Sequence, residues 1–189
     1  ALYGMARDLS GALTVEQAAD IARRLIHDTL AANTRLYLPT SAGELKEAGG
    51  AAGISDGITA RFAHLAFRSG KAVGPGTPDI EHMPILFLPL SAPMRVRGVM
   101  TVTLGKSPLL PEQRQLLETV ASLVAIVIER LHYVEVAQEA LVRVESERLR
   151  NALLSAISHD LRTPLTALVG LSDSLAMTGE GLPQNKREA

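Results

Sequence analysis

The 189-residue sequence contains no cysteine and no tryptophan, and aromatic residues make up only 3% of it. Without cysteine the chain cannot form disulfides, thiolate metal sites, thiol nucleophiles or a covalent link to a bilin. The scarcity of aromatic side chains argues against a nucleic-acid surface built on stacked bases. The net charge of −1 provides no global positive field. We therefore expect no nucleic-acid partner.

Long hydrophobic runs are absent as well. The longest, VASLVAIVI at Val120–Ile128, is far shorter than the roughly 20 apolar residues that a membrane helix needs. The N-terminus shows no signal-peptide pattern. The sequence starts without an initiator methionine and ends in a polar tail, so we expect it to be part of a longer protein. Its hydrophobic content of 47% is ordinary for a globular domain.

The N-terminal part of the chain predicts a helix followed by a strand. The helix covers Thr14–Leu30, and Thr14 and Gln17 have the spacing of a capping box at its start. A short strand follows over Arg35–Leu38. The polar, glycine-containing stretch from there to Gly57 indicates a loop.

A second helix is predicted over Ile58–Arg68, with Gly70 as its C-terminal cap. The apolar side chains that we expect it to bury are Ile58, Phe62 and Leu65. Three basic side chains share another face of this helix, namely Arg61, His64 and Arg68. They are candidates for binding an anionic ligand, and the alternative is a face in contact with solvent only. No spacing of histidines or carboxylates predicts a metal site.

The segment Gly70–Pro84 is too rich in glycine and proline for regular structure, and a β-hairpin follows it. Its strands cover Ile85–Leu90 and Val96–Leu104. In the second strand apolar residues and Gly98 alternate with Arg97 and threonines, so we expect a hairpin buried on one face. Helices beside an antiparallel sheet predict an α+β domain.

One long helix is predicted after Pro108, with a start signal at Pro111. Apolar residues and one glutamine then recur at spacings of three and four: Val124, Val127, Leu131, Val134, Gln138 and Leu141. This pattern is typical of a coiled-coil seam, and a second copy of the chain is its simplest partner. The pattern slips at Glu145–Arg148 and resumes out of phase, which predicts a local change in winding.

The segment SHDLRTPL, Ser158–Leu165, combines a possible nucleophile with a helix-bending residue. Neutral imidazole is a competent nucleophile near pH 7, and His159 is followed directly by the carboxylate of Asp160. Arg162 supplies a cation of the kind that stabilises a transferred phosphoryl group. Pro164 removes one backbone hydrogen bond and lets the helix bend. The alternative is a proline-kinked helix with an exposed His–Asp pair.

The same segment resembles the phosphoacceptor motif of sensor histidine kinases of two-component systems. The resemblance implies that His159 accepts the phosphoryl group and that Asp160 is its acid/base partner. It also implies that Thr163 aligns the water that dephosphorylates the response regulator, and that Pro164 is the hinge.

The preceding part of the chain resembles a GAF domain in two segments, FLPL…RVRGVMTV (Phe87–Val102) and LLPEQRQLLETVASLVAIVIER (Leu109–Arg130). Together with LYGMARDLS, the GPGT run at Gly74–Thr77 and LLSAISHDLRTPLT, these segments are similar to the potassium-responsive, KdpD-type sensor kinases. The implied fold is a GAF-like antiparallel sheet with flanking helices, followed by a long coiled-coil helix leading into the phosphoacceptor helix.

The resemblance implies three regions: a GAF-like sensory domain over residues 1–130, a coiled-coil signalling helix over 131–150 and the first part of a dimerisation and phosphoacceptor domain over 151–189. No ATP-binding motif follows, so ATP would be bound by another domain of the parent kinase and this fragment alone should be inactive. The implied partners are a second copy of the chain, that ATP-binding domain and a response regulator that controls potassium-uptake genes. The implied location is the cytoplasmic side of an inner-membrane-anchored bacterial protein.

Two other interpretations fit the same residues. In the first, the GAF-like domain binds a ligand or partner, and the histidine-containing helix is only a dimerisation element without catalysis. In the second, the protein is a phosphatase-only regulator, which needs Thr163 and not His159.

Overall fold

The computed structural model describes residues 2–50, 54, 57–75, 83–105 and 109–179. Part of the segment Gly70–Pro84 and residues 180–189 therefore lie outside the described structure. The chain divides into two compact units, Ala1–Glu135 and Val136–Ala189. The elements in chain order are α1 (Leu2–Ser10), α2 (Val15–Leu30), β1 (Asn33–Pro39), β2 (Leu45–Glu47), α3 (Gly57–Ser69), β3 (Ile85–Ser91), β4 (Val96–Thr103) and α4 (Pro111–Gly179).

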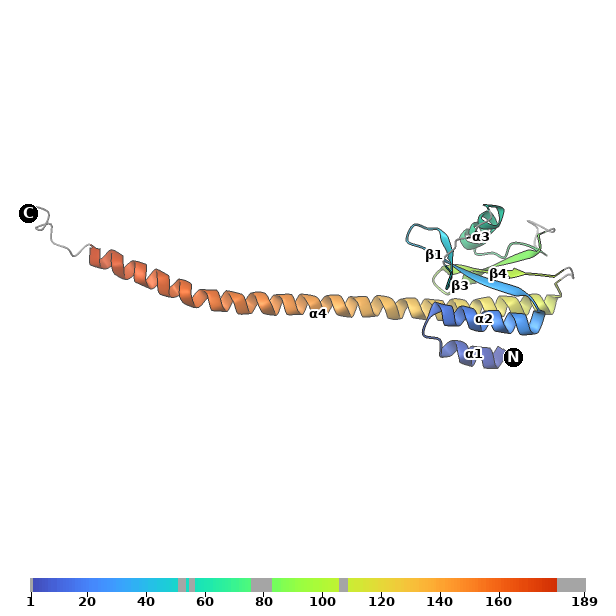
Figure 1. Cartoon of the computed structure of the whole chain (residues 1–189), viewed down its shortest axis with the longest axis horizontal. Helices are drawn as coiled ribbons and strands as arrows, with labels where there is room; N and C mark the ends of the chain where they lie inside the picture. The colour runs from blue at the N-terminus through green and yellow to red at the C-terminus, as the bar shows by residue number, and fades with distance from the viewer. Residues whose placement is uncertain (1, 51–53, 55–56, 76–82, 106–108, 180–189) are drawn as a thin grey trace, which may run out of the picture. The chain divides into compact units, whose positions relative to one another are not determined.

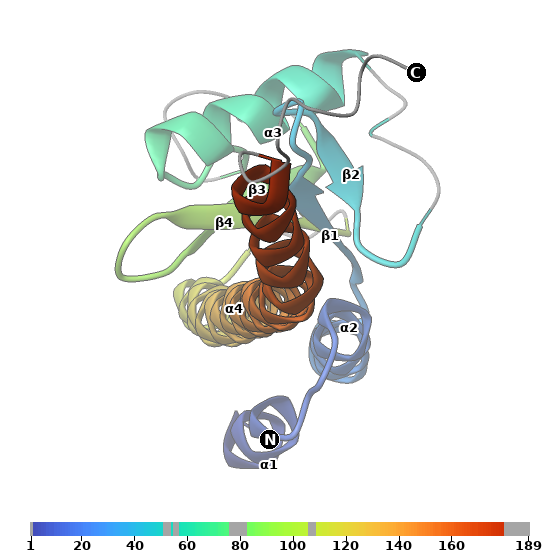
Figure 2. The ribbon, with the colours of Figure 1, turned by 90° about the vertical axis from the view of Figure 1, so that its left-hand side faces the viewer.

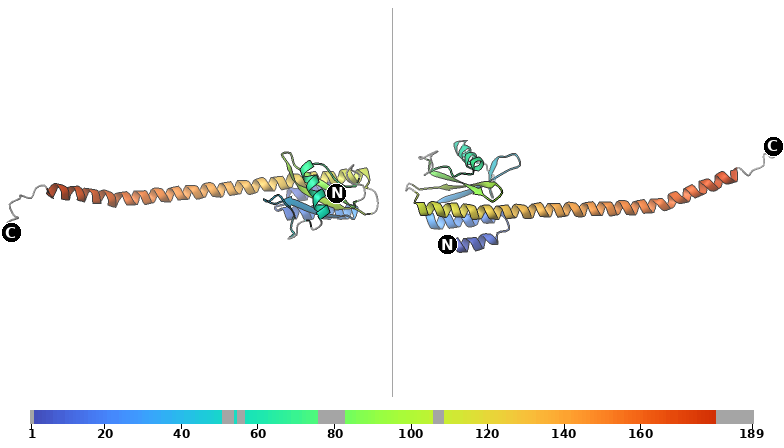
Figure 3. Two further views of the ribbon diagram at one scale, coloured as in Figure 1. Left: turned by 90° about the horizontal axis from the view of Figure 1, so that it is seen from above. Right: turned by 180° about the vertical axis from the view of Figure 1, so that it is seen from behind.

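The first unit is built on a four-stranded antiparallel sheet with the strand order β2-β1-β4-β3. In the register of the central pair, Leu36 lies opposite Met100, and Leu88 lies opposite Met100 on the other side. Helix α2 and the first part of α4 run side by side along one face of the sheet, and α3 covers the other face (Figures 1 and 2). Helix α1 packs on the far side of α2, as the right-hand view of Figure 3 also shows. The prediction of an α+β fold is confirmed.

Two hydrophobic clusters hold these layers together. The larger lies between the sheet and α1, α2 and α4, and includes Leu86, Leu88, Met100 and Val102 from the sheet. On the helix side, alanines 18, 19 and 22 of α2 are fully buried, which lets the helix backbone approach the strands closely. The smaller cluster lies under α3 and contains Phe87 and Val99.

The ends of α2 and α3 follow from their cap residues. Thr14 is the N-cap of α2, and its side chain accepts a hydrogen bond from the Gln17 backbone N–H at 3.3 Å. The predicted cap at Thr14 is confirmed, and the Gln17 side chain accepts from the N–H of Leu13 at 2.8 Å, one residue before the N-cap N–H that a capping box uses. Helix α3 ends at Gly70, which has a φ of 64° and donates to the Ala66 carbonyl. This left-handed conformation favours glycine.

Two predictions about burial were wrong. The polar residues of β4 do not form one exposed face: Thr101 is 6% exposed because β4 is a central strand covered by α3, Arg97 is buried against Glu129 of α4, and Thr103 at the strand end is exposed. Helix α3 does not bury Ile58 and Leu65, which are 59% and 43% exposed. It turns two alanines, Ala63 and Ala66, toward the sheet.

Two residues of the predicted coiled-coil seam lie in the core of the first unit instead. Val124 and Val127 are 0% and 8% exposed and belong to the core of the first unit, so they cannot face a second copy of the chain. From Tyr133 to Ser174 every residue of α4 is exposed. Among the described residues, no helix is both long enough and apolar enough to cross a membrane.

We expect Gly98→Ala to destabilise the first unit. A Cβ at this position would collide with the Tyr37 carbonyl oxygen and lie 2.8 Å from Leu38 Cδ2, so β1 and β4 would have to separate. Such overpacking costs about 1–3 kcal/mol, measurable as a lower urea midpoint. Gly105→Ala is the control, because a Cβ there meets no atom within 4 Å. Equal midpoints for the two variants would contradict the close approach of β1 and β4.

Candidate functional site

The predicted nucleophile lies exposed on α4 in the second unit. The side chains of His159 and Asp160 are 81% and 85% exposed, and His159 Nδ1 lies 3.3 Å from Asp160 Oδ1. Adjacent helical residues point about 100° apart, so this contact joins the edge of the ring to the carboxylate. Because Nδ1 faces Asp160, Nε2 is the ring nitrogen that remains available to an incoming group.

The polar residues of the motif share the face of α4 that carries His159. Arg162, Thr163 and Thr166 lie within roughly one quarter turn of His159 on either side, since successive residues advance by about 100°. The Thr166 hydroxyl donates to the Arg162 carbonyl at 2.8 Å. The arrangement places a cation and a hydroxyl beside the imidazole.

An apolar stripe lies on the opposite side of the same helix. Its members Ile157, Leu161, Leu165 and Leu168 are all more than half exposed in the single chain. Exposed contiguous apolar surface of this kind marks an interaction surface. A partner seated on this stripe would leave His159 facing away from the contact.

Pro164 lies inside α4 without ending it. Its ring nitrogen carries no hydrogen, so the Asp160 carbonyl lacks the helical donor that it would otherwise have. The ribbon of α4 bends in its red C-terminal part (Figure 1). Because Asp160 follows His159 directly, the missing hydrogen bond lies within one turn of the candidate nucleophile.

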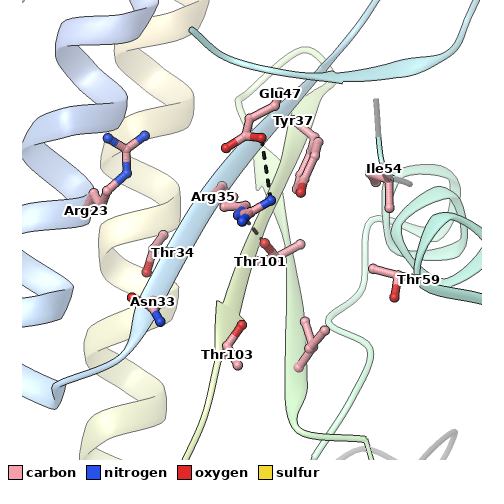
Figure 4. Close-up of a pocket in the computed structure, with 11 residues that line it drawn as sticks. Arg23, Asn33, Thr34, Arg35, Tyr37, Glu47, Ile54, Thr59, Thr101 and Thr103 are labelled. Atoms are coloured by element: carbon pink, nitrogen blue, oxygen red, sulfur yellow. Dashed lines mark hydrogen bonds and ion pairs between the residues drawn. The ribbon is translucent and has the colours of Figure 1, made fainter. Parts of the chain in front are cut away.

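A second candidate site is a cleft of about 590 Å³ on the α3 side of the sheet. Figure 4 shows its lining, which comes from α2, the strands, α3 and the segment before α3: Arg23, Asn33, Thr34, Arg35, Tyr37, Glu47, Ile54, Thr59, Ile85, Thr101 and Thr103. Arg35 and Glu47 form an ion pair at 3.7 Å across β1 and β2. The Thr101 hydroxyl donates to the Arg35 carbonyl at 3.4 Å. The threonine hydroxyls of the lining can donate and accept hydrogen bonds, and the Arg35–Glu47 pair adds no net charge. Such a lining favours a small polar ligand.

The basic residues predicted as ligand contacts do not line this cleft. Arg61 and Arg68 are exposed on α3 and His64 is half-buried, whereas the contribution of α3 to the cleft is Thr59. Sequence reasoning missed Arg35, Glu47 and Thr101. The available signal was the pair of threonines, Thr101 and Thr103, in an otherwise apolar strand. The described residues contain no cluster of three His, Asp or Glu side chains that could hold a metal ion.

Comparison with known families matches both units. A GAF domain model matches residues 12–130, and a model of the His Kinase A (phospho-acceptor) domain matches residues 149–189. A GAF domain followed by a phospho-acceptor domain defines a fragment of a two-component sensor histidine kinase. The predicted family resemblance is thereby confirmed.

Comparison with individual proteins assigns the chain to a narrower family. It is 34% identical over 190 residues to the sensor protein KdpD of Escherichia coli, an alignment that covers 98% of this chain and 21% of that protein. It is 31% identical over 126 residues to the sensor protein KdpD of Clostridium acetobutylicum, covering 67% of this chain and 14% of that protein. The chain thus spans about a fifth or less of the length of these relatives.

A solved structure agrees with these relatives. The crystal structure of the native GAF domain of the potassium sensor histidine kinase KdpD from Escherichia coli has a TM-score of 0.61 and 30% identity to this chain. The match covers 72% of this chain and 96% of that one. The chain belongs to the KdpD family of sensor histidine kinases.

We expect Pro164→Ala to slow amide hydrogen exchange around the phosphoacceptor motif. Alanine restores an N–H that donates to the Asp160 carbonyl. It also removes a proline that destabilises a helix interior by about 3 kcal/mol relative to alanine. The measurement is exchange by mass spectrometry in peptides that span Leu161–Leu168. Ser155→Ala, which leaves the backbone donors unchanged, is the control. Unchanged exchange in Pro164→Ala would mean that the proline does not loosen this turn.

Proposed function

We propose that this chain is the sensory and phosphoacceptor part of a kinase in which His159 receives a phosphoryl group from ATP. The observation that carries the proposal is the exposed His159–Asp160 pair, with 3.3 Å between Nδ1 and Oδ1, inside the region matched by the phospho-acceptor family. Nucleophilic attack needs a reachable nitrogen lone pair, and the geometry leaves Nε2 in that position.

At the start of the reaction Nδ1 carries the ring proton and donates a hydrogen bond to the Asp160 carboxylate. Nε2 of His159 attacks the γ-phosphorus of ATP held by an ATP-binding domain of the parent kinase. The new P–N bond forms as the bond from phosphorus to the bridging oxygen breaks, and ADP leaves with that electron pair. The ring gains positive charge, and Asp160 accepts the Nδ1 proton. Arg162 stabilises the charge on the transferred phosphoryl group.

The phosphoryl group then passes to an aspartate of a response regulator. The carboxylate oxygen attacks phosphorus, the P–N bond breaks, and His159 is regenerated. Thr163 positions the water that later hydrolyses the acyl phosphate, and Pro164 is the hinge that lets the ATP-binding domain approach and leave. In these steps ATP is bound by the ATP-binding domain of the parent kinase and not by this chain. The fragment alone would therefore not phosphorylate itself.

The first unit supplies the input in this account. Its cleft binds a small polar ligand or docks a partner, and the parent controls potassium-uptake genes from the cytoplasmic side of the inner membrane. The name of the Escherichia coli relative, a potassium sensor histidine kinase, supports the potassium assignment. The competing function is a non-catalytic GAF module that binds a ligand or partner and dimerises through α4; the exposed apolar stripe supports its dimerisation equally well.

The direct test is phosphate transfer from labelled ATP to the parent kinase that contains this chain. We expect acid-labile label on the unmodified kinase and none on His159→Gln, because glutamine lacks the nucleophilic nitrogen. His27→Gln is the matched control, since His27 is an exposed helical histidine outside the motif. Equal labelling of the His159 variant, or no labelling of the unmodified kinase, would favour the non-catalytic module.

We expect Leu168→Glu to weaken the dimer by at least about tenfold in Kd, which corresponds to roughly 1.4 kcal/mol. In the dimer this side chain would be buried, and an unpaired carboxylate in an apolar contact is strongly unfavourable. Sedimentation equilibrium of the chain measures the effect. Thr166→Glu places the same charge on the face that carries His159 and should leave the Kd nearly unchanged. Equal weakening by both variants would contradict the stripe as the dimer seam.

A further inference from the structure

The last turn of α4 within the first unit contacts two other parts of that unit through polar side chains. We call these residues the collar; they are Glu129, Arg130, His132 and Tyr133. The collar lies immediately before the boundary between the two units after Glu135, and every residue of α4 from Tyr133 to Ser174 is exposed. The collar is therefore the last place where other elements of the first unit hold this helix.

On one side the collar is held by β4. Arg97 Nη2 lies 3.2 Å from Glu129 Oε1, and the two side chains are 8% and 10% exposed. The Arg97 guanidinium also lies over the ring of Tyr133, with 5.6 Å between the guanidinium carbon and the ring centroid. Any rotation of α4 that separates this pair leaves two buried charges without partners, which is strongly unfavourable. The pair therefore favours one rotational position of the helix.

Two further contacts hold the collar. Arg130 donates to the carbonyls of Ser10, the last residue of α1, and of Ala12, two residues further on, at 2.7 and 2.6 Å. His132 Nε2 lies 3.4 Å from Arg95, in the turn between β3 and β4. Glu129 and Arg130 point about 100° apart, so the hairpin and the end of α1 hold different sides of the same helical turn.

Strand β4 joins the collar to the cleft. The strand carries Arg97 at its start and contributes Thr101 and Thr103 to the cleft lining. A ligand that moves these threonines also acts on the strand that positions Arg97, because close-packed interiors transmit displacement. The physical requirement for coupling is an element whose position both sites influence, and β4 satisfies it.

We propose that the collar sets the rotational position at which α4 leaves the first unit, and that Arg97 and Glu129 are positioning residues for phosphorylation at His159. The inference rests on the proposed function in its last step, because the helix that the collar orients carries the phosphoacceptor. Breaking the pair changes which residues of α4 form the dimer seam, and occupancy of the cleft acts through the same pair.

The test uses the absence of cysteine from the chain. Single cysteines are introduced in turn at positions 136 to 142, and the fraction of disulfide-linked dimer is measured after mild oxidation. In the otherwise unmodified chain we expect maxima at Gln138 and Leu141, which continue the seam from Val134. With Glu129→Gln the maxima should move to neighbouring positions or flatten. The charge-swapped variant, Arg97→Glu with Glu129→Arg, should restore the original pattern, which a general loss of stability would not do.

Two further variants complete the design. Glu118→Gln is the matched control, because Glu118 forms an exposed ion pair with Arg114 on the same helix, and its pattern should match the unmodified chain. Arg130→Gln removes the contacts to Ser10 and Ala12 without leaving a buried charge alone, so it tests the collar even if Glu129→Gln does not fold. Unmoved maxima in both collar variants, or no cross-link at any position in the unmodified chain, would overturn the inference.

Labelling of the parent kinase separates this inference from the proposed function. We expect Glu129→Gln to change the rate of labelling of His159 by about fivefold or more, the lower range of typical coupling between sites. A parent that never labels His159 while the cross-linking maxima move would defeat the proposed function and leave the collar intact. Normal labelling with unmoved maxima would defeat the collar alone.

Discussion

Leu117, Val120 and Val124 of α4 are fully buried against the sheet, and the rest of the structure depends on this contact. The helix that carries the phosphoacceptor motif is thereby part of the hydrophobic core of the GAF unit and not an appended segment. Burial of a large aliphatic side chain contributes roughly 1.5–3 kcal/mol, so the helix cannot detach from the sheet without losing much of the stability of the unit. A change in the sheet must move the helix with it or strain the contact.

The division of α4 between two kinds of contact follows from this burial. Up to Ile128 most apolar residues of α4 pack in the core of the first unit, with Ile126 an exposed exception, and from Val134 onward its apolar residues are exposed. The apolar residues of α4 therefore fall into two sets, one buried in the core of the first unit and one exposed. The collar lies where the buried set ends and the exposed set begins, and its buried ion pair joins α4 to β4 at this point.

Most of the elements could be predicted from the sequence, because periodicity and cap residues are local signals. Thr14, Gln17 and Gly70 marked helix ends that the structure confirms. Burial could not be predicted as well. Thr101 is buried because β4 is a central strand, and its hydroxyl donates to the Arg35 carbonyl. Both observations depend on residues far apart in the sequence, so the pattern of β4 alone does not predict them. Strand β2 was missed since its three residues are ordered by pairing with β1.

The two candidate sites also differ in how much of each could be predicted from the sequence. The His159 motif is eight consecutive residues on one helix, so its sequence already fixes which side chains share a face. The cleft draws its lining from α2, all four strands, α3 and Ile54 before α3, and Arg97 and Glu129 of the ion pair are 32 positions apart. Such assemblies depend on sheet topology, which the pattern of a single strand does not specify.

The central claim is that the imidazole of His159 carries the phosphoryl group. Trypsin cleavage after Arg150 and Arg162 releases NALLSAISHDLR, Asn151–Arg162, in which His159 is the one histidine. The most direct measurement is mass spectrometry of this peptide at alkaline pH after the parent kinase is incubated with ATP. The account predicts one phosphate on the peptide, on His159, lost after brief acid treatment. An unmodified peptide from a kinase that has incorporated phosphate elsewhere would contradict it.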